Sequence, residues 1–403
     1  MRIGLLRETK IPVDNRVALD PQQAAMMKHQ YPDLDILVQP SPDRAFSDEE
    51  YRQEGIRVQE DLSACDLLLG IKEQGGDLLI PGKHYVFFGH FAKRQPHNRP
   101  LLQSLMEHGV SFSDYEYMVD EGNGRVCAFG WWAGIVGVYL TLRGYGLRTG
   151  LFSLPMLTPD FTIARIQSLL QSLKLPAVKM VLTGRGRVAR GAHYILDAMG
   201  VSIVPVEAYL QAEQVDRFTC TFAYIDQLVR PKRGDGPVDV SEFHAHPERY
   251  ESNFQRFART SVMLVCCHYW DPAAPVYLSP EDYCDPSFRI RMIGDITCDI
   301  EGSIRSTLRA STHASPYYDY DPVTGQECPA FSSPDHVTVM AVDTCPNALP
   351  RETSHYFGEM LLEHVIRPLA EGRPSAVLSR ATILNNGQLT PRFSYLEDFA
   401  RKR

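Results

Sequence analysis

Residues 180–200 read MVLTGRGRVARGAHYILDAMG, and this stretch decides the fold of the region around it. An apolar run ends at Thr183, a short G-R-G turn follows, and apolar residues then recur at helical spacing. Gly184, Gly186 and Ala189 form a G-x-G-x-x-A pattern at this junction, where backbone N–H groups and the positive end of a helix can hold a pyrophosphate. A turn without a ligand would also favour glycine, so its place between a strand and a helix carries the argument. We predict a dinucleotide-binding turn.

Short apolar runs alternate with helix-like stretches on both sides of this turn. The alternation is typical of βαβ units, in which helices cover both faces of a parallel sheet. We therefore predict an α/β fold with two Rossmann-like, doubly wound parallel-sheet domains and the active site in the cleft between them. The predicted strands lie within residues 1–8, 35–40, 66–73, 85–90 and 110–116 and, in the second series, within 178–186, 201–209, 262–270 and 289–297.

Two long helical segments indicate how the domains are connected. Residues 128–150 are too long for a strand and predict a connecting helix that bridges the domains, with Gly134 and Gly137 allowing close packing. Residues 349–372 predict a terminal helix that packs back on the first domain. The predicted domains are a discontinuous substrate and catalytic domain, 1–130 plus about 345–403, and a dinucleotide-binding domain, 131–344, with ordered insertions at 229–254 and 310–331.

Composition excludes several classes of partner. The 403 residues carry 49 acidic and 41 basic side chains, and the formal net charge of −8 gives no basic field for nucleic acid or anionic lipid. No stretch reaches the ~18 uninterrupted apolar residues of a membrane span, and the first ten residues lack the apolar core of a signal peptide. We expect a cytoplasmic protein. The nine cysteines are scattered and predict neither a disulfide framework nor a metal site, and Cys266 and Cys267 are expected to be small buried hydrophobes.

Glu207 bears on the choice of cofactor. The strand within 201–209 is expected to end at this residue, 23 positions beyond Gly184, where an acidic side chain can hydrogen-bond the adenosine ribose. A carboxylate there favours NAD(H) over NADP(H). Arg185, Arg187 and Arg190 could instead meet a 2′-phosphate, so the preference for NAD is weak.

Reactive side chains follow the predicted strands of the first domain. Lys72 follows the strand within 66–73, and His90 and Lys93 follow the next one, at the edge where open parallel sheets place their active sites. A lysine in a desolvated cleft and a histidine that titrates near neutral pH can together move the protons that imine chemistry requires. Arg16 and Arg125 are suited to bidentate binding of substrate carboxylates, unless they are ordinary surface ion-pair partners.

These residues lie in stretches that resemble the lysine-forming saccharopine dehydrogenases, and most closely the lysine/2-oxoglutarate reductase half of the bifunctional aminoadipic semialdehyde synthases. Alanine dehydrogenase and the transhydrogenase catalytic domain are similar at a greater distance. The resemblance covers nearly the whole chain and rests on residues 6–19, 69–73, 87–93, 114–120, 124–137, 181–192, 246–254, 294–307 and 349–361.

The resemblance implies a role for each matching residue. Lys72 and His90 would be the acid–base pair, Glu73 and Glu116 would tune the two lysines, and Asp299 would lie beside the nicotinamide. An ordinary alternative for Asp299 is a helix N-cap before IEGSIRS. The substrate site would be lined by Arg16, Lys93, Gln95, Glu116, Arg125 and Phe129, and the cofactor site by Gly184, Gly186, Arg187, Val188, Glu207 and Thr297.

The implied activity is the reversible, NAD(P)-dependent reductive condensation of L-lysine with 2-oxoglutarate to saccharopine, with no metal. The expected partners are these small molecules, without nucleic acid or membrane, and the sequence leaves both a monomer and a homo-oligomer open. Two departures from the family pattern are Thr183 in place of a glycine and Val188 in place of a cysteine. The alternatives are alanine dehydrogenase, an opine-type dehydrogenase with a different amine, and a cofactor-binding sensor that has lost turnover. A sensor would not need a proton shuttle such as Lys72 and His90.

Overall fold

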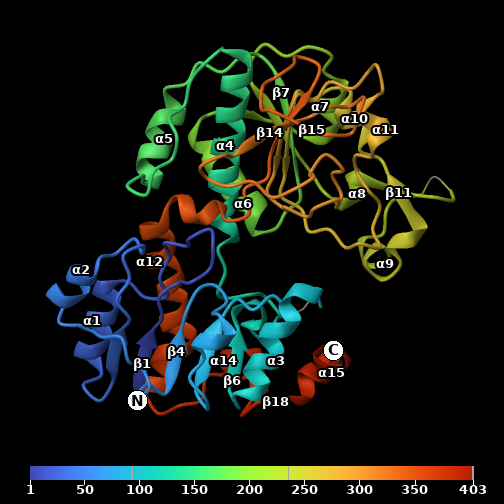
Figure 1. Ribbon diagram of the computed structural model, residues 1–403. Helices are drawn as coiled ribbons and strands as arrows, with labels where there is room; N and C mark the ends of the chain where they lie inside the picture. Colours follow the sequence, from blue (N-terminus) through green and yellow to red (C-terminus); the bar gives the residue numbers. More distant parts are fainter. Residues whose placement is uncertain (92–93, 235, 402–403) are drawn as a thin grey trace. The chain divides into compact units, whose positions relative to one another are not determined.

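The computed structural model describes residues 1–91, 94–234 and 236–401. The chain divides into two compact units, Met1–Phe129 with Leu349–Arg403, and Gly130–Ala348. Each unit has a mostly parallel sheet flanked by helices, as the sequence predicts (Figure 1). Each sheet has eight strands, more than the five and four predicted. In Figure 1 the C-terminal elements, coloured orange to red, lie among the blue and cyan N-terminal elements of the first unit.

The sheet of the first unit has the order β18-β17-β6-β5-β4-β1-β2-β3. Its strands are β1 (Arg2–Leu5), β2 (Asp35–Val38), β3 (Arg57–Val58), β4 (Leu67–Leu69), β5 (His84–Phe87), β6 (Ser111–Asp114), β17 (Thr382–Asn385) and β18 (Gln388–Leu389). The strands from β6 to β3 pair in parallel, and β17 and β18 continue the sheet antiparallel. All five strands predicted for this unit are confirmed.

Helices cover both faces of this sheet because its buried strands are apolar on both sides. In β4, Leu67 and Leu69 belong to one buried cluster and Leu68 to another, as the alternation of side chains along a strand requires. The helices are α1 (Pro21–Gln30), α2 (Asp48–Gln53), α3 (Arg99–Glu107), α12 (Pro350–Leu361), α13 (Arg367–Ala370), α14 (Ala376–Ala381) and α15 (Glu397–Arg401), with a π-helical turn at Leu362–Ile366 and 3₁₀ turns at Gly76–Leu78, Pro96–Asn98, Tyr115–Tyr117 and Pro391–Leu396.

The sheet of the second unit has the order β15-β14-β16-β13-β12-β7-β9-β8. Its strands are β7 (Lys179–Thr183), β8 (Ser202–Ile203), β9 (Thr219–Ala223), β12 (Met263–Cys266), β13 (Met292–Asp295), β14 (Tyr317–Tyr320), β15 (Glu327–Cys328) and β16 (Val337–Met340). The strands from β16 to β8 pair in parallel, and β14 and β15 continue the sheet antiparallel. The segment 310–331, predicted as an insertion, thus extends the sheet itself.

The helices of the second unit begin with α4, the long helix predicted at 128–150, and the unit itself begins at the first residue of α4. They are α4 (Gly130–Thr149), α5 (Ile163–Gln171), α6 (Arg187–Ala198), α7 (Val206–Gln211), α8 (Ile225–Leu228), α9 (Val240–Ala245), α10 (Gln255–Ala258) and α11 (Pro280–Tyr283), with 3₁₀ turns at Pro247–Arg249 and Cys345–Ala348. The segment 229–254 holds α9 and a two-stranded ribbon, β10 (Val229–Pro231) with β11 (Tyr250–Ser252).

One expectation about local structure is wrong, and one alternative is excluded. The strand within 201–209 ends at Ile203, and Glu207 lies in the first turn of α7, because Pro205 has no N–H to extend the strand ladder and Val206 turns inward as the first residue of the helix. Residues 300–307 form turns rather than a helix, so Asp299 is not a helix N-cap.

Cys266 and Cys267 are buried, as expected. Within the described parts of the chain, no helix is both long enough and apolar enough to cross a membrane.

Candidate active site and dinucleotide turn

The carboxyl ends of four parallel strands bring polar side chains to one edge of the first sheet. Glu8 follows β1, Lys72 follows β4, His90 follows β5 and Glu116 follows β6. These strands are neighbours in the order β6-β5-β4-β1, so residues far apart in the sequence converge at this edge. Active sites of open parallel sheets lie at this edge.

His90 is held in a defined orientation. Its Nδ1 lies 3.1 Å from Oε1 of Glu116, and its backbone has φ of 54°, in the left-handed region that few non-glycine residues adopt. The Asn98 side chain donates a hydrogen bond to the His90 carbonyl at 3.0 Å. The buried Asp114 accepts hydrogen bonds from the backbone N–H groups of Gly89 (3.1 Å) and Glu116 (2.9 Å). Burial and the Glu116 charge raise the pKa of Asp114 above its ordinary value. Asp114 thus connects the ends of β5 and β6 next to His90.

Glu8 holds the backbone at the catalytic candidate Lys72. Its two side-chain oxygens accept hydrogen bonds from the backbone N–H groups of Ile71 at 2.6 Å and Lys72 at 2.8 Å. Burial, with the charge of Asp14, raises the pKa of Glu8 to about 8 in spite of those two bonds. Sequence reasoning missed Glu8. The sequence did offer a signal, because Glu8 is a charged residue that follows a buried parallel strand. Lys72 was selected on the same ground.

Arg16 is buried, with 4% of its surface exposed, and its guanidinium forms a two-point ion pair with Asp14 at 2.9 and 2.5 Å. The guanidinium lies 4.1 Å from the centre of the Phe129 ring, which stacks on Phe357 of α12 with ring centres 4.5 Å apart. Burial opposes ionisation of Asp14, but its pair with Arg16 and the charge of Lys72 keep its pKa below its ordinary value. Sequence reasoning also missed Asp14.

The other residues predicted for this site, the tuning residue Glu73 and three substrate residues, lie in different surroundings. Glu73 forms an ion pair with Lys10, which together with the charge of His90 lowers its pKa. Gln95 and Arg125 are exposed, at the start of the Pro96–Asn98 turn and in the loop after Tyr115–Tyr117. Lys93 lies outside the described residues. Polar contacts and charge interactions thus connect a cluster of residues at the carboxyl ends of the parallel strands of the first sheet. Its members are Glu8, Lys10, Asp14, Arg16, Lys72, Glu73, His90, Asp114 and Glu116.

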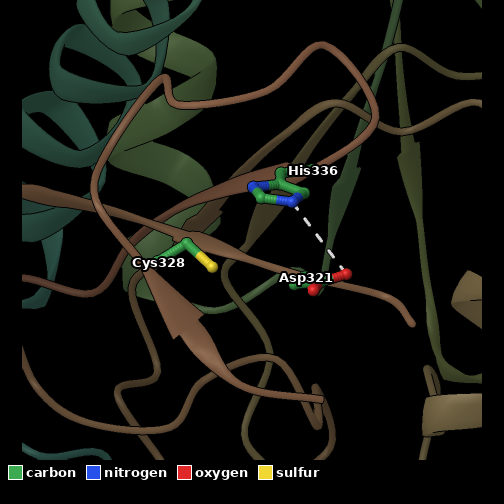
Figure 2. A group of neighbouring side chains, drawn as sticks. All are labelled: Asp321, Cys328 and His336. Carbon is green, nitrogen blue, oxygen red and sulfur yellow. Dashed lines mark ion pairs between the residues drawn. The ribbon is translucent and has the colours of Figure 1, made fainter. Parts of the chain in front are cut away.

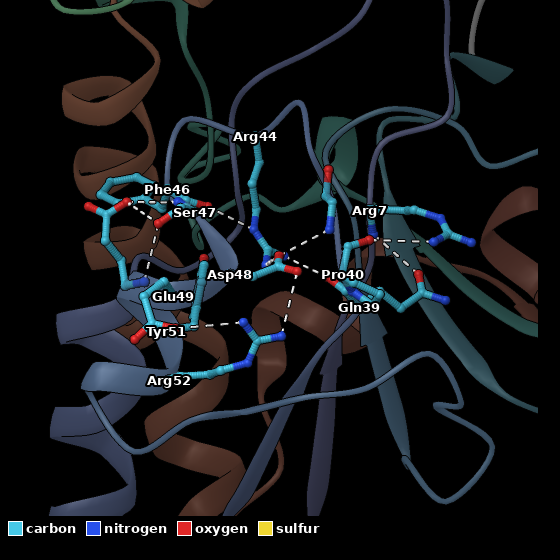
Figure 3. A network of polar contacts seen from close by, with 12 residues as sticks. Arg7, Gln39, Pro40, Arg44, Phe46, Ser47, Asp48, Glu49, Tyr51 and Arg52 are labelled. Atoms are coloured by element: carbon cyan, nitrogen blue, oxygen red, sulfur yellow. Dashed lines mark hydrogen bonds and ion pairs between the residues drawn. The ribbon is translucent and has the colours of Figure 1, made fainter.

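A hollow of about 610 Å³ lies in the first unit, lined by residues that follow β1 and β2. Figure 3 shows that polar side chains of this lining contact one another. Arg44 pairs with Asp48 and donates hydrogen bonds to the carbonyls of Gln39 (2.7 Å) and Phe46 (2.8 Å), and Arg52 lies 3.9 Å from Asp48. These contacts hold the loop before α2 in place, so we assign the arginines a structural role.

In the second unit, the predicted dinucleotide turn has the geometry its glycines suggest. Gly184 has φ of +87°, and a Cβ there would lie 2.8 Å from the carbonyl oxygen of Cys267. Gly186 begins α6 without a side-chain cap, and a Cβ at this position would meet no atom within 4 Å. An open position before an uncapped twelve-residue helix suits a pyrophosphate, so the turn fits a dinucleotide. Arg187 and Val188 are the first two residues of α6.

Close packing of α4 against α6 fixes the helix that follows this turn. A Cβ on Gly134 of α4 would lie 2.0 Å from the Val188 carbonyl oxygen, and one on Gly191 of α6 would lie 1.8 Å from the Trp131 carbonyl oxygen. Real Cβ atoms do not approach backbone atoms so closely, so only glycine permits this crossing. Gly137 similarly gives room to the Ile296 side chain.

Thr183, which departs from the family pattern, links the carboxyl ends of β7 and β12. Its hydroxyl lies 2.6 Å from Nδ1 of His268 and accepts the backbone N–H of Cys267 at 3.2 Å. The other ring nitrogen of His268 lies 2.8 Å from the Ser303 hydroxyl. Burial lowers the pKa of His268 to about 3, so the ring is neutral at neutral pH. Sequence reasoning missed His268.

The remaining predicted cofactor residues lie near strand ends of the same sheet. Thr297 follows β13 and donates its hydroxyl and its backbone N–H to the buried Asp295, at 2.6 and 3.1 Å. The backbone N–H of Asp299 lies 3.4 Å from the Thr297 hydroxyl. Glu207 is exposed in α7, and its charge acts on Arg256.

Fold and site together define a two-unit α/β protein with a strand–turn–helix of the dinucleotide-binding type. Residues 4–136 match the family described as alanine dehydrogenase/PNT, N-terminal domain. The chain is 30% identical over 438 residues to alpha-aminoadipic semialdehyde synthase of Arabidopsis thaliana, covering 98% of this chain and 41% of that protein. It is 26% identical over 401 residues to saccharopine dehydrogenase [NAD(+), L-lysine-forming] of Neurospora crassa, covering 94% of each. The resemblance seen in the sequence is confirmed, and the chain is a homologue of NAD-dependent oxidoreductases.

The chain spans less than half the length of the semialdehyde synthases it matches, 41% to 45% in the plant and mammalian proteins. Among solved structures, an L-alanine dehydrogenase matches with a TM-score of 0.66 at 17% identity, covering 99% of this chain and all of that one. The transhydrogenase of Sinorhizobium meliloti matches with a TM-score of 0.56 at 12% identity, covering 97% of this chain and all of that one. These two likenesses show the fold.

Proposed function

We propose that this chain catalyses the reversible, NAD(P)-dependent reductive condensation of L-lysine with 2-oxoglutarate to saccharopine. The observation that carries the proposal is the convergence of Lys72 and the His90–Glu116 pair at one strand edge of the first unit. The names of the fungal relatives, saccharopine dehydrogenase [NAD(+), L-lysine-forming], support saccharopine and lysine as substrate and product. The choice of 2-oxoglutarate rests on the family resemblance of the sequence.

The chemistry assigns a task to each group. Attack of the lysine ε-amine on the ketone of 2-oxoglutarate gives a carbinolamine, which loses water to form an imine. Reduction of the imine carbon and protonation of its nitrogen give the secondary amine of saccharopine. These steps need a group that delivers and removes protons near neutral pH, and we assign this role to Lys72 and His90. Reduced nicotinamide, when bound, supplies the hydride.

The two substrates together bring three carboxylates, which require cationic partners. Arg125, which is exposed, is the stronger candidate for direct binding. The Arg16 guanidinium already bonds Asp14, so a substrate carboxylate would have to share it. Lys93, Gln95 and Phe129 stay predicted substrate contacts.

We assign the dinucleotide to the second unit, with its pyrophosphate at Gly184 and Gly186, its nicotinamide near Asp299 and its ribose near Glu207. NAD(H) is preferred in this proposal because Glu207 offers a carboxylate to the ribose. The exposure of Glu207 supports it, since the side chain is accessible to a ligand.

Initial rates test the proposal directly. Lysine with 2-oxoglutarate is compared with ammonia and pyruvate, using NADH and NADPH in turn, and other amines are then substituted for lysine. We expect turnover with lysine and 2-oxoglutarate to exceed the other combinations. Preference for ammonia and pyruvate would identify an alanine dehydrogenase, preference for another amine an opine enzyme, and NADH binding without any turnover a sensor. Each of these three results would overturn the proposal.

A further inference from the structure

We propose that Asp321, Cys328 and His336 form a binding site for a divalent cation of the zinc class, at the far side of the second sheet from the dinucleotide turn. One ligand atom from each residue lies within 4.8 Å of the others, and the three side chains point toward one another in Figure 2. A zinc ion bound by sulfur at about 2.3 Å and by nitrogen and oxygen at about 2.0 Å would draw these atoms closer by small side-chain rotations.

Strand register explains why the three residues meet. Asp319 of β14 pairs with Cys328 of β15, and Tyr320 pairs with Val337 of β16, which places Asp321 opposite His336. Directly opposed residues of antiparallel strands project to the same face, and so do residues two apart on one strand. Asp319, Asp321, Cys328 and His336 therefore share one face.

The histidine is oriented as a metal ligand would be. Its Nε2 is directed to Asp321, at 3.9 Å from Oδ1, while its Nδ1 lies 3.2 Å from the Ser332 hydroxyl and 3.8 Å from Asp319. Histidines that bind metals commonly engage a carboxylate or another polar group through the second ring nitrogen, which fixes the ring. Ser332 and Asp319 occupy that place here.

Hydrogen bonds and an ion pair hold the residues next to the cluster. Asp319 is completely buried and accepts hydrogen bonds from the Thr338 hydroxyl at 2.7 Å and the Ser332 backbone N–H at 3.0 Å. Arg148, at the end of α4, lies 3.5 Å from Asp319 and donates to the His336 carbonyl at 2.6 Å. Asp319 is therefore engaged in the scaffold. Asp321 accepts the Val323 backbone N–H at 2.9 Å and the Thr324 hydroxyl at 2.7 Å, one on each oxygen, and a second lone pair on each oxygen remains for a metal ion. Its ligand oxygen lies within 4.8 Å of the ligand atoms of Cys328 and His336.

The donor set selects the ion. A thiolate with an imidazole and a carboxylate suits zinc and its first-row neighbours, whereas calcium and magnesium prefer oxygen ligands alone. Three protein ligands leave a fourth, tetrahedral position for water. His336 precedes the parallel strand β16, so the cluster lies at the amino edge of that strand, whereas the dinucleotide turn follows the carboxyl end of β7. We therefore expect the ion to fasten β14, β15 and β16 together and to play no part in hydride transfer.

Cobalt, which reports thiolate ligation by a near-ultraviolet charge-transfer band, provides the test. Chelator-treated, tag-free protein is titrated with Co²⁺ and, in competition, with Zn²⁺. We expect saturation at one ion per chain with a thiolate band, displacement by zinc, and a higher melting temperature with zinc. Cys328→Ser should abolish the band and weaken binding at least about tenfold, and His336→Asn should weaken binding similarly.

Cys284→Ser is the matched control, because Cys284 is exposed near the same hairpin, 3.2 Å from the Pro322 carbonyl, but outside the cluster. It should keep the band and the affinity of the wild type. Melting temperatures without metal verify that each variant is folded. The proposal is overturned if the wild type shows no thiolate band, if Cys328→Ser or His336→Asn binds Co²⁺ as the wild type does, or if Cys284→Ser loses the band.

Discussion

Gly186→Val separates the role of the dinucleotide turn in binding from its role in folding. The residue has φ of −73° and ψ of −165°, which any amino acid adopts, and a Cβ there meets no protein atom within 4 Å. The folding effect should be limited to the loss of a good N-cap residue, about 1 kcal/mol. The new side chain would stand where our proposal places the pyrophosphate, against the N–H groups of α6. Each charge-assisted hydrogen bond lost contributes about 1.5–3 kcal/mol, so NADH affinity should fall by roughly tenfold to a hundredfold for each bond.

Gly134→Ala is the opposite control. Its Cβ would lie 2.0 Å from the Val188 carbonyl oxygen and 2.7 Å from the Ala192 backbone nitrogen. Because those atoms belong to the backbone of α6, the clash with the new Cβ can be removed only if α4 and α6 move apart. Overpacking of this kind costs about 1–3 kcal/mol, more than the roughly 1 kcal/mol that alanine gains over glycine in a helix. Gly134→Ala should therefore lower stability even without ligand.

Urea unfolding without cofactor and calorimetric titration with NADH measure the two effects separately. Gly186→Val should keep nearly the wild-type unfolding free energy and lose NADH binding. Gly134→Ala should already have a lower unfolding free energy in urea without NADH. Wild-type NADH affinity in Gly186→Val would refute the placement of the pyrophosphate. If Gly186→Val lost as much unfolding free energy as Gly134→Ala, the inference that a side chain at position 186 meets no protein atom would be refuted.

Three further predictions concern the chemistry and the charges. Lys72→Met and His90→Gln should each lower turnover about 10²- to 10⁴-fold while NADH binding persists, and unchanged turnover in both would remove the proposed proton shuttle. The wild type should have a higher kcat/KM with NADH than with NADPH, and Glu207→Ser should narrow that ratio; an unchanged ratio would show that Glu207 does not contact the ribose. Folded Glu8 keeps its proton up to about pH 8, whereas in the unfolded chain its pKa has the ordinary value of 4.5, so this residue makes the unfolding free energy fall as pH rises between those values. Glu8→Gln should remove that part of the fall, about 1.4 kcal/mol per unit of pKa shift, and identical pH profiles of urea unfolding would contradict it.

The parts of the fold that depend on local pattern were predictable. Apolar runs of three to five residues followed by polar ones locate β4 and β7, and the carboxyl-edge rule then selects Lys72 and the glycine turn. Glycines at 134 and 191 permit the α4–α6 crossing, but only Gly134 was marked by the sequence, since a glycine within an apolar helix signals close packing. The partner position becomes evident only when the two helices are in contact.

Features that depend on contacts between distant residues were not predictable from one sequence. The hydrogen bonds of Glu8 to the Lys72 loop join positions 64 residues apart. Glu207 was placed on a strand because VSIVPVE alternates like one, yet Pro205 ends the ladder. Cys328 and His336 lack zinc-finger spacing, and only the register of β14 with its two neighbours brings them to one face.

A final expectation concerns the independence of the two proposed ligand sites on the second sheet. The dinucleotide turn follows the carboxyl end of β7, while the proposed cation site lies beyond the opposite end of the parallel strands, on β14, β15 and β16. Coupling between two ligands is reciprocal, so if zinc altered NADH affinity, NADH would alter zinc affinity by the same factor. The cluster rests on Asp319, Thr338 and Arg148, none of which belongs to the turn, and we therefore expect a coupling factor near one. Zinc should raise the melting temperature by the same amount with and without saturating NADH. A difference beyond error, reproduced as a shift in NADH affinity, would show that the sheet transmits strain from one edge to the other and would refute the independence argued here.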